Sequence, residues 1–572
     1  MRHMFVAAMF ALLAACGGGG GGSSSGGGGS GAAPPPPPAK PTSAEASRLL
    51  TQASFGPTDG DIASVVSAGI SGWIDQQTAA VLPAQSNRAY VEARLAGLGA
   101  VSASQFYETW WKQAATEPGQ LRQRVAFALS QIFVISYNDP NVDIRGGASY
   151  YDMLEADAFG NFRKLLEDVT LHPMMGRYLT YLSNQKEDAA GTRTPDENYA
   201  REVMQLMTLG LVQLNTDGSA KLDGTGATLA SYTSDDIKGL AKVFTGLSWY
   251  SPTPTNTTFL GGSADPNSTV TPMIFYPTFH STSAKTFLGV TIAANPTVDV
   301  AGDLKTALDT LYNHPNVGPF ISFRLIQQLV TSNPTPAYVG RVAAVFNNNG
   351  AGVRGDMMAV VKAILTDAEA RDASVSTSAS FGKLREPLIR TTNWIRAFGA
   401  ASQTGNWLIT STSANTALSQ SPLTSGSVFN FWRPGYTPPG TTALGSRALL
   451  APEFQVVDEI TVAAWINNIQ SWVDLGIGST PPAGSGRDVR SAYTAEIAVA
   501  DTPASLIDRM NTLLFGGAMS ATLQGRLNVL ISAIAIPAAT GSNQAAIDAA
   551  RLNRAKMAVF LSLVSPEYLI QR

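Results

Sequence analysis

The stretch GQLRQRVAFALSQIFVIS, residues 119–136, has the hydrophobic periodicity of an amphipathic helix. Four large apolar residues recur at three- and four-residue steps and would share one face: Val125, Leu129, Ile132 and Phe133. Similar runs fill most of the following chain, with no β-rich repeat and no phosphate-binding glycine loop. We therefore predict a mainly α-helical body over residues 44–572. Short β-hairpins are expected only in the Thr-, Gly- and Pro-rich segments 213–233 and 250–292.

Two segments of this body resemble each other. AVVKAILTDAEARD ends one helix and opens another around Thr366 and Glu369. AVFLSLVSPEYLIQR has a similar break around Ser565 and Glu567. The similarity indicates a repeated helix–turn unit, and a chance match of two short segments is the alternative.

Composition excludes several classes of function. The chain has 572 residues, which predicts one large domain or two intimately packed ones, and only 14% of its residues are charged. No block of Lys and Arg could neutralise a run of phosphates, so nucleic acid is not expected as a partner. One cysteine excludes disulfides within the chain, and four histidines without an HExxH pattern give no zinc motif. No cofactor is expected.

The N-terminus has the pattern of a bacterial lipoprotein. MRHMFVAAMFALLAAC combines a positive residue, Arg2, with an apolar run too short to span a bilayer. Its end, Leu-Ala-Ala-Cys16, resembles a lipobox, which implies removal of residues 1–15 and lipid attachment at Cys16. The alternative is an ordinary cleaved signal peptide with a chance cysteine.

Residues 16–43 are rich in Gly, Ser and Pro and lack the apolar content to fold, so we expect a disordered, lipid-anchored linker. The expected location is the cell envelope, on the extracytoplasmic side. No Asp follows the cysteine to mark inner-membrane retention, so the outer membrane is expected if the host is Gram-negative.

Seven blocks occur in the order found in one bacterial family: FGNFRKLLEDVTLHPMMGRYL, ENYAREVMQLMTLG, YTSDDIKGLAKVFTGLSW, HSTSAKTFLG, HPNVGPFISFRLIQQLV, SPLTSGSVFNFWRPGY and SPEYLIQR. Over residues 44–572 the chain resembles the domain of unknown function 1800 family. The resemblance implies a large exported protein without an agreed activity. It also implies a partner similar to the alkaline phosphatase and sulfatase superfamily, because such proteins are often encoded nearby. Relatives often carry His or Phe at Met207, so a His there is not essential in this chain.

The stretch TPDENYAREVMQLMTLG, residues 194–210, concentrates charge on one short helix. We expect Thr194 to cap this helix and Glu197 to complete a capping box or pair with Arg201. Glu202 lies beside the apolar stripe, one turn above Asn198, and should be partly buried with a partner. Three cations could supply an internal ion pair, namely Arg324, Arg385 and Lys285. A metal or a substrate is the alternative.

Two further groups could perform chemistry. His280 and Lys285 lie on one polar, aromatic-rich loop and are candidates for acid–base catalysis or anion binding, or for bonds that only shape the loop. His172 and His314 precede prolines and are expected to cap helices. The segment FNFWRPGYTPPG is predicted to pack as an aromatic plug, with sugar stacking by Trp432 as the alternative.

Two functions follow from these patterns. The first is a lipid-anchored binding or assembly partner of another exported protein. The second is a hydrolase or lyase acting on an extracytoplasmic polymer, with a site built from four side chains: Glu202, His280, Lys285 and Arg385. Convergence of these side chains in one open pocket would favour the enzyme.

Overall fold

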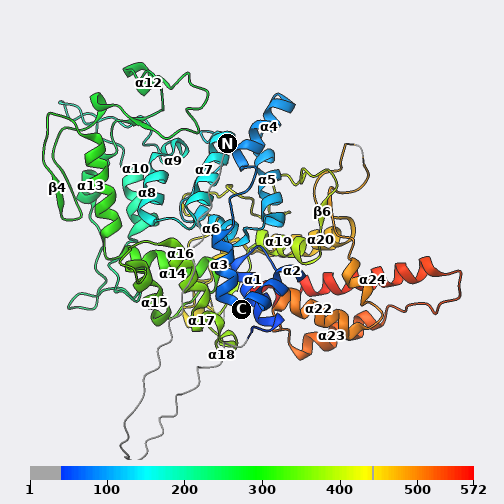
Figure 1. The fold of residues 1–572 in the computed structure, drawn as a ribbon. Coiled ribbons are helices and arrows are strands. Elements are labelled where there is room, and N and C mark those ends of the chain that lie inside the picture. The colour runs from blue at the N-terminus through cyan, green and yellow to red at the C-terminus, as the bar shows by residue number, and fades with distance from the viewer. Residues whose placement is uncertain (1–39, 441–443, 483) are drawn as a thin grey trace, which may run out of the picture. The chain divides into compact units, whose positions relative to one another are not determined.

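The computed structural model describes residues 40–440, 444–482 and 484–572. Cys16, the lipobox and the linker up to Ala39 therefore lie outside the described residues. Helices dominate the described chain, as predicted, and its strands form short two-stranded pairs (Figure 1). Residues Lys40–Arg572 form one compact unit. No helix in the described ranges is long and apolar enough to cross a bilayer.

The first part of the body is built only from helices. They are α1 (Ser43–Ala53), α2 (Asp59–Ala68), α3 (Ile70–Ala79), α4 (Asn87–Leu98), α5 (Ala103–Thr116), α6 (Gln120–Ser130), α7 (Ile144–Asp157), α8 (Phe162–Leu171) and α9 (Pro173–Tyr178). The predicted amphipathic helix at residues 119–136 is α6, but it ends at Ser130 and is buried on every side. Some of its polar atoms form specific bonds. Arg124, for example, donates to the backbone oxygen of Gln328 at 2.5 Å. By contrast, Nε of Arg122 and Nε and Nη1 of Arg124 have no hydrogen-bond partner among the described residues.

The middle part mixes helices with short hairpins. Its helices are α10 (Asn198–Glu202), the π-helix η1 (Val203–Thr208), α11 (Ser234–Val243), α12 (Asn256–Gly261), the 3₁₀-helix η2 (Pro277–Phe279), α13 (Val300–Asn313), α14 (Val317–Leu329), α15 (Pro336–Asn347), α16 (Met357–Thr366), α17 (Ala368–Arg371), α18 (Ala373–Ser376) and α19 (Pro387–Ala397). Antiparallel pairs join β1 (Leu247–Ser248) to β2 (Ile274–Phe275) and β3 (Lys285–Phe287) to β4 (Val290–Ile292). Isolated bridges occur between residues 212 and 230. Of these strands, β2, β3 and β4 lie in the segment 250–292, and isolated bridges occupy the segment 213–233, where hairpins are expected, whereas β1 lies outside both segments.

The C-terminal part is helical again. It comprises the 3₁₀-helices η3 (Gly445–Arg447) and η4 (Pro452–Val456) and the helices α20 (Glu459–Leu475), α21 (Thr494–Ala498), α22 (Pro503–Phe515), α23 (Ala521–Ser532), α24 (Gln544–Leu563) and α25 (Pro566–Leu569). Two further antiparallel pairs join distant segments, β5 (Lys383–Leu384) with β8 (Ile570–Gln571) and β6 (Ala401–Ser402) with β7 (Val489–Arg490). The last residues of the chain thereby pair with the segment that precedes α19. Both pairs, β5–β8 and β6–β7, lie outside the segments 213–233 and 250–292, where hairpins are expected.

The repeated helix–turn unit is present in the structure. Glu369 accepts the backbone N–H of Thr335 at 3.0 Å and its hydroxyl at 2.5 Å, at the start of α15. Glu567 accepts the corresponding groups of Ser520 at 2.9 and 2.6 Å, at the start of α23. The short helices themselves are capped by Asp367 and Ser565. Two carboxylates therefore hold equivalent helix N-termini in both copies.

One glycine brings the loop with His280 and Lys285 against α11. A Cβ atom added to Gly239 would lie 1.7 Å from the backbone oxygen of Thr286, so any side chain there would force α11 and β3 apart.

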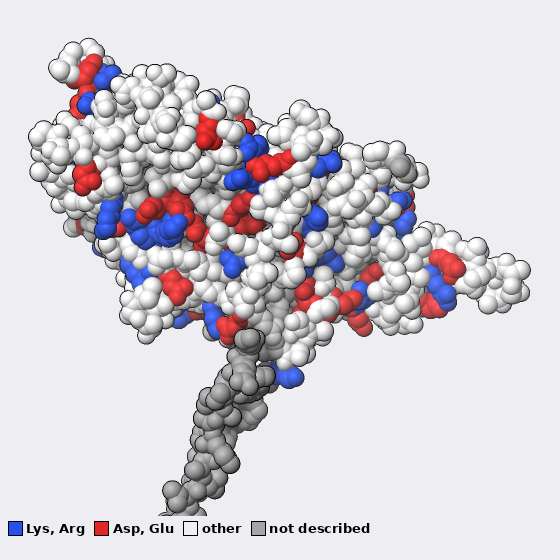
Figure 2. Space-filling model, turned by 45° about the horizontal axis from the view of Figure 1, so that its top comes forward, with Lys and Arg blue, Asp and Glu red and all other residues white. Residues whose placement is uncertain are grey.

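The surface of the molecule is low in charge. On the face in Figure 2, Lys and Arg residues are interspersed with Asp and Glu among large uncharged areas.

Candidate functional site

The charged helix of residues 194–210 begins later than its sequence predicts. α10 starts at Asn198 with Glu197 at its N-cap and no side-chain capping bond, so the prediction that Thr194 caps this helix is wrong. Asp196, which precedes the helix, accepts the backbone N–H of Asn198 with its Oδ1 at 2.8 Å. The capping box of Glu197 is also absent. Glu197 instead accepts from Arg201 at 3.2 Å, as the alternative predicted, on a partly exposed surface. Asn198 donates to the hydroxyl of Thr180 at 3.4 Å.

Glu202 is buried, as predicted, but its predicted ion pair is wrong. The side chain is 7% exposed at the end of α10, where the helix widens into the π-helix η1. Its three proposed partners make other contacts: Arg324 with Gln327, Arg385 with the backbone oxygen of Leu514, and Lys285 with Asp303. Glu202 Oε2 has no hydrogen-bond partner in the described chain, and burial raises the pKa of the carboxyl group.

His280 and Lys285 meet at a closed polar cluster. His280 Nε2 and Lys285 Nζ each lie 2.9 Å from Asp303 Oδ2. The other imidazole nitrogen contacts the backbone oxygen of Thr245 at 2.7 Å, and Lys285 also donates to the backbone oxygen of Ser281. His280 is 1% and Lys285 2% exposed. This geometry supports a role in shaping the loop, because both side chains have hydrogen-bond partners and are sealed from solvent.

The remaining predicted residues also have structural contacts. Arg385 is buried, with its guanidinium 4.5 Å from the ring centroid of Tyr568. His172 caps α9 as predicted, whereas the prediction for His314 is wrong, because the N-cap of α14 is Asn316 and this helix has no side-chain capping bond. His314 Nδ1 accepts the backbone N–H of Asn316, and His172 Nδ1 accepts that of Met174. Burial lowers the pKa of His172 to about 3, so this imidazole is neutral.

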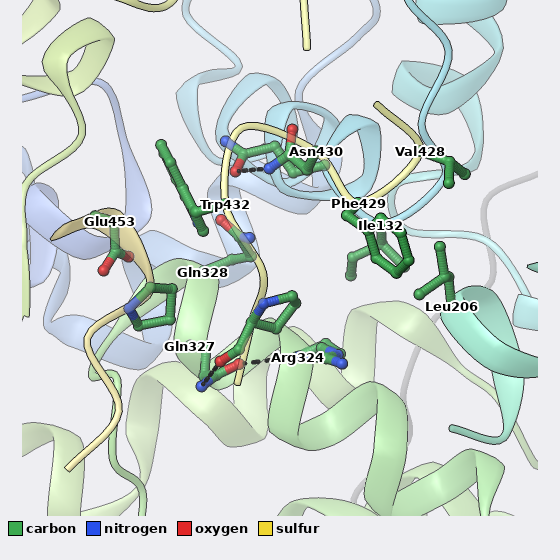
Figure 3. Close-up of a pocket in the computed structure, with 13 residues that line it drawn as sticks. Ile132, Leu206, Arg324, Gln327, Gln328, Val428, Phe429, Asn430, Trp432 and Glu453 are labelled. Carbon is green, nitrogen blue, oxygen red and sulfur yellow. Dashed lines mark hydrogen bonds between the residues drawn. The ribbon is translucent and has the colours of Figure 1, made fainter. Parts of the chain in front are cut away.

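A different set of residues forms a cleft at the end of α6, against α14 (Figure 3). The residues that line this Glu453 cleft are Gln131, Ile132, Leu206, Arg324, Gln327, Gln328, Val428, Phe429, Asn430, Trp432, Pro434, Pro452 and Glu453. Its cavity volume is about 30 Å³. That space admits about two water molecules or the tip of one polar group.

A relay of buried polar side chains runs beside the cleft. Asn430 donates to Gln131 at 2.9 Å, and Gln131 donates to Glu386 at 2.7 Å. Lys383 lies 3.7 Å from Glu386 Oε1 and 3.0 Å from Glu453 Oε1. Lys383 also donates to the backbone oxygens of residues 327 and 328 on α14. The relay thus connects the loop of residues 428–434 to the short helix η4.

The charges of this relay do not balance. Glu386 and Glu453 share Lys383 as the cation that they contact, and the buried Arg124 and Arg390 act on them only at longer range. Two carboxylates beside one contacting cation make each other costlier to ionise. Burial and the charge of Glu386 raise the pKa of Glu453, and Lys383 only partly opposes this. Oε2 of Glu453 has no hydrogen-bond partner among the described residues. The raised pKa and the unpartnered oxygen make Glu453 the carboxyl group of this cleft best suited to exchange a proton with a bound group.

A wider, mainly apolar groove adjoins the cleft. The residues that line this Phe429 groove are Gln205, Leu206, Leu209, Gly210, Leu211, Val212, Leu214, Gly218, Pro319, Phe320, Phe323, Arg324, Phe429, Arg433, Pro434, Gly435, Tyr436, Thr437 and Leu450. Its cavity volume is about 640 Å³. Four residues line both spaces, namely Leu206, Arg324, Phe429 and Pro434. The groove therefore leads into the cleft.

Arg324 lies at this junction without a carboxylate. It contacts the side-chain oxygen of Gln327 at 3.4 Å, and its guanidinium lies 5.0 Å from the ring centroid of Phe320. Within the described chain Arg324 forms no ion pair, and burial lowers its pKa to about 10, so it stays charged at neutral pH. Arg433, at the same groove, is exposed and lies over the ring of Phe429. An anionic group entering the groove would meet both cations.

None of the four residues considered for catalysis, Glu202, His280, Lys285 and Arg385, lines the Glu453 cleft. The block SPLTSGSVFNFWRPGY lines the cleft with Val428, Phe429, Asn430 and Trp432, and Trp432 is buried, as expected for an aromatic plug. Asn430 has φ of 68°, a left-handed conformation that is uncommon outside glycine and often marks a functional loop. Glu453 and Lys383 carry no local motif, because only the tertiary fold brings them together.

Comparison with known proteins gives one match. A family model described as a protein of unknown function, DUF1800, matches residues 48–570. No curated protein and no solved structure matches the chain.

Proposed function

We propose that this chain, which belongs to the DUF1800 family, is a lipid-anchored protein of the bacterial cell envelope that binds a segment of another exported protein in the Phe429 groove. The observation that supports this proposal is Arg324, a cation without a carboxylate partner in the described chain, at the point where an apolar groove meets a polar cleft. Arg324 is half-buried and contacts no carboxylate within the described chain, so its guanidinium can still pair with an anionic group of a ligand.

The shape of the two spaces specifies the ligand. The groove is lined by Leu and Phe side chains, which suit an apolar segment, and Arg324 and Arg433 suit an acidic residue within it. The cleft is too small for anything larger than a polar tip. We therefore expect an extended segment with apolar side chains and one carboxylate that reaches Arg324.

The partner we propose is an exported protein similar to the alkaline phosphatase and sulfatase superfamily. The family resemblance implies such a partner, and the charge and shape of the groove fit a protein segment. A binding role also agrees with the four residues first considered for catalysis, because Glu202, His280, Lys285 and Arg385 form no common pocket among those described.

Binding of the purified partner by this chain tests the proposal. Arg324→Gln should weaken the affinity at least about tenfold, because a charge-assisted hydrogen bond is lost. Leu211→Asp should weaken it further, because Leu211 lines the groove and is 62% exposed. Leu222→Asp is the matched control, since Leu222 is 58% exposed and does not line the groove. Equal affinities of all variants would refute the proposal.

The anchor has its own test. Cys16→Ser removes the proposed lipid attachment site and should release the protein from the membrane fraction of its host, as followed by fractionation and immunoblotting. Unchanged retention of the variant in the membrane would contradict the lipoprotein assignment without bearing on the groove.

A second candidate is a hydrolase or lyase acting on an extracytoplasmic polymer, with Glu453 as the proton donor. One observation favours it: the raised pKa and unpartnered oxygen of Glu453 at a cleft of water-molecule size. Incubation with peptidoglycan and with exopolysaccharide should then release soluble fragments, and Glu453→Gln should abolish the release. Absence of fragments from the wild-type chain, or equal release by the variant, would exclude this candidate.

A further inference from the structure

A second apolar groove lies away from the Phe429 groove, between α19, α20 and α25. We call it the Arg390 groove, and its cavity volume is about 340 Å³. This size lies within the range of small-molecule binding sites. Residues of β5 and η4 complete its wall. The groove shares no lining residue with the Glu453 cleft or the Phe429 groove.

The wall of this groove is almost entirely apolar. Typical members are Leu418, Phe454, Val462, Trp465 and Ile466. Val462 and Ile466 are 49% and 41% exposed, so α20 presents large apolar side chains to solvent at the rim. Exposed apolar surface next to a cavity indicates a site for an apolar ligand.

Arg390 is the charged residue among the described side chains that line this groove. It is 7% exposed, its Nε donates to the backbone oxygen of Arg385 at 2.7 Å, and its guanidinium lies 5.3 Å from the ring centroid of Trp465. No ion pair of Arg390 occurs within the described residues, and Glu386 and Glu453 act on it only through longer-range charge. A buried guanidinium beside an apolar cavity therefore lacks a contacting anion.

We propose that the Arg390 groove binds a fatty acid, with its carboxylate on Arg390 and its alkyl chain along the apolar wall of α20. A planar carboxylate matches the fork of donors on a guanidinium. An alkyl chain matches a wall without other charged groups, and each further buried methylene should raise the affinity about fourfold until the groove is filled. This site is separate from the partner-binding groove, and neither proposal depends on the other.

The test uses the full-length chain with Cys16→Ser, so that an acyl group attached to the protein cannot compete. Dodecanoate is titrated into the protein and the fluorescence of Trp465, a lining residue, is followed together with the heat of binding. We expect saturable binding, binding of decanoate that is more than tenfold weaker, and binding of dodecanol at least tenfold weaker than that of dodecanoate. Equal binding of dodecanol, or no saturable binding of dodecanoate, would overturn the proposal.

Two variants locate the site. Arg390→Gln should weaken the affinity for dodecanoate at least tenfold and leave the affinity for dodecanol unchanged. Val462→Asp changes an exposed residue at the rim of the groove, so the variant should still fold. It should also weaken the binding of dodecanoate. Ile460→Asp is its matched control, because Ile460 is 50% exposed on the same helix but does not line the groove. Tighter binding of an apolar peptide through its C-terminal carboxylate, or of a lysophospholipid, would replace the fatty acid as occupant and overturn the proposal.

Discussion

Among the described residues, two buried clusters join a lysine to a carboxylate, and of these two the cluster at Glu453 borders a cleft. In the first, Lys285 and His280 both contact Asp303 at 2.9 Å, so one carboxylate meets two nitrogen bases. In the second, Lys383 contacts Glu453 at 3.0 Å and also lies 3.7 Å from Glu386. The first cluster has more hydrogen-bond donors than carboxylate oxygens, and backbone oxygens accept from the remaining donors. The second cluster has more carboxylate oxygens than donors, and one of these oxygens has no partner.

This difference separates a structural cluster from a candidate site. A satisfied cluster fixes a loop and has no capacity left for a ligand. The cluster at Glu453 has an unpartnered oxygen, a raised pKa and an adjoining cleft, so it can still accept or donate a hydrogen bond. Judged by residue type alone, the cluster with His280 would be the better candidate for a catalytic site, because histidine is the more frequent catalytic group.

The largest effect is expected from breaking the closed cluster. Lys285→Met leaves the Asp303 carboxylate without its lysine, and we expect the free energy of unfolding to fall by about 3 kcal/mol. Chemical denaturation followed by circular dichroism measures the change. Lys305→Met is the control, because Lys305 pairs with Asp309 on the surface and should cost less than about 1 kcal/mol. Equal losses in the two variants would mean that the closed cluster does not hold the loop.

A smaller effect is expected at the open cluster. Glu453→Gln should change the free energy of unfolding by less than about 1 kcal/mol near pH 5. The reason is that Lys383 still contacts Glu386 and two backbone oxygens in the variant. The pKa of Glu453 is raised on folding, so its contribution is complete below the pKa of the unfolded chain and is lost as the pH rises through the folded pKa. The variant should therefore gain stability relative to wild type as the pH rises.

Denaturation of wild type and Glu453→Gln between pH 4 and pH 8 checks this trend. A wild-type chain that gains stability relative to the variant with rising pH would show that Glu453 is an ordinary ionised partner of Lys383. The distinction between the two clusters would then fail.

The smallest effect is expected at Glu202. Its carboxyl group has a raised pKa and forms no ion pair with the cations considered for it, so Glu202→Gln should leave the free energy of unfolding equal or slightly higher, within about 1 kcal/mol. Glu197→Gln removes only a partly exposed pair with Arg201 and serves as the control. Denaturation of both variants beside wild type measures the difference. A clear loss in Glu202→Gln alone would reveal a stabilising partner.

The helical class of the fold can be predicted from the sequence, because it depends on local hydrophobic periodicity. The repeated unit around Glu369 and Glu567 can also be predicted from the similarity of two segments. Local patterns failed where tertiary structure decides. Thr194 does not cap α10, and α6 is buried on every face because other elements pack around it, with Arg124 bonded to the backbone oxygen of Gln328. The Glu453 cleft combines residues more than 300 positions apart, so no spacing rule could have indicated it.

Photo-crosslinking in living cells tests the central claim most directly. A photoreactive phenylalanine analogue is placed at Leu211 in the Phe429 groove or at Leu222 outside it, two sites of similar exposure. We predict an adduct with the phosphatase-like exported protein from Leu211, its loss when Arg324→Gln is added, and no adduct from Leu222. Equal adducts from both positions, or an adduct from Leu211 that Arg324→Gln leaves unchanged, would contradict binding in this groove.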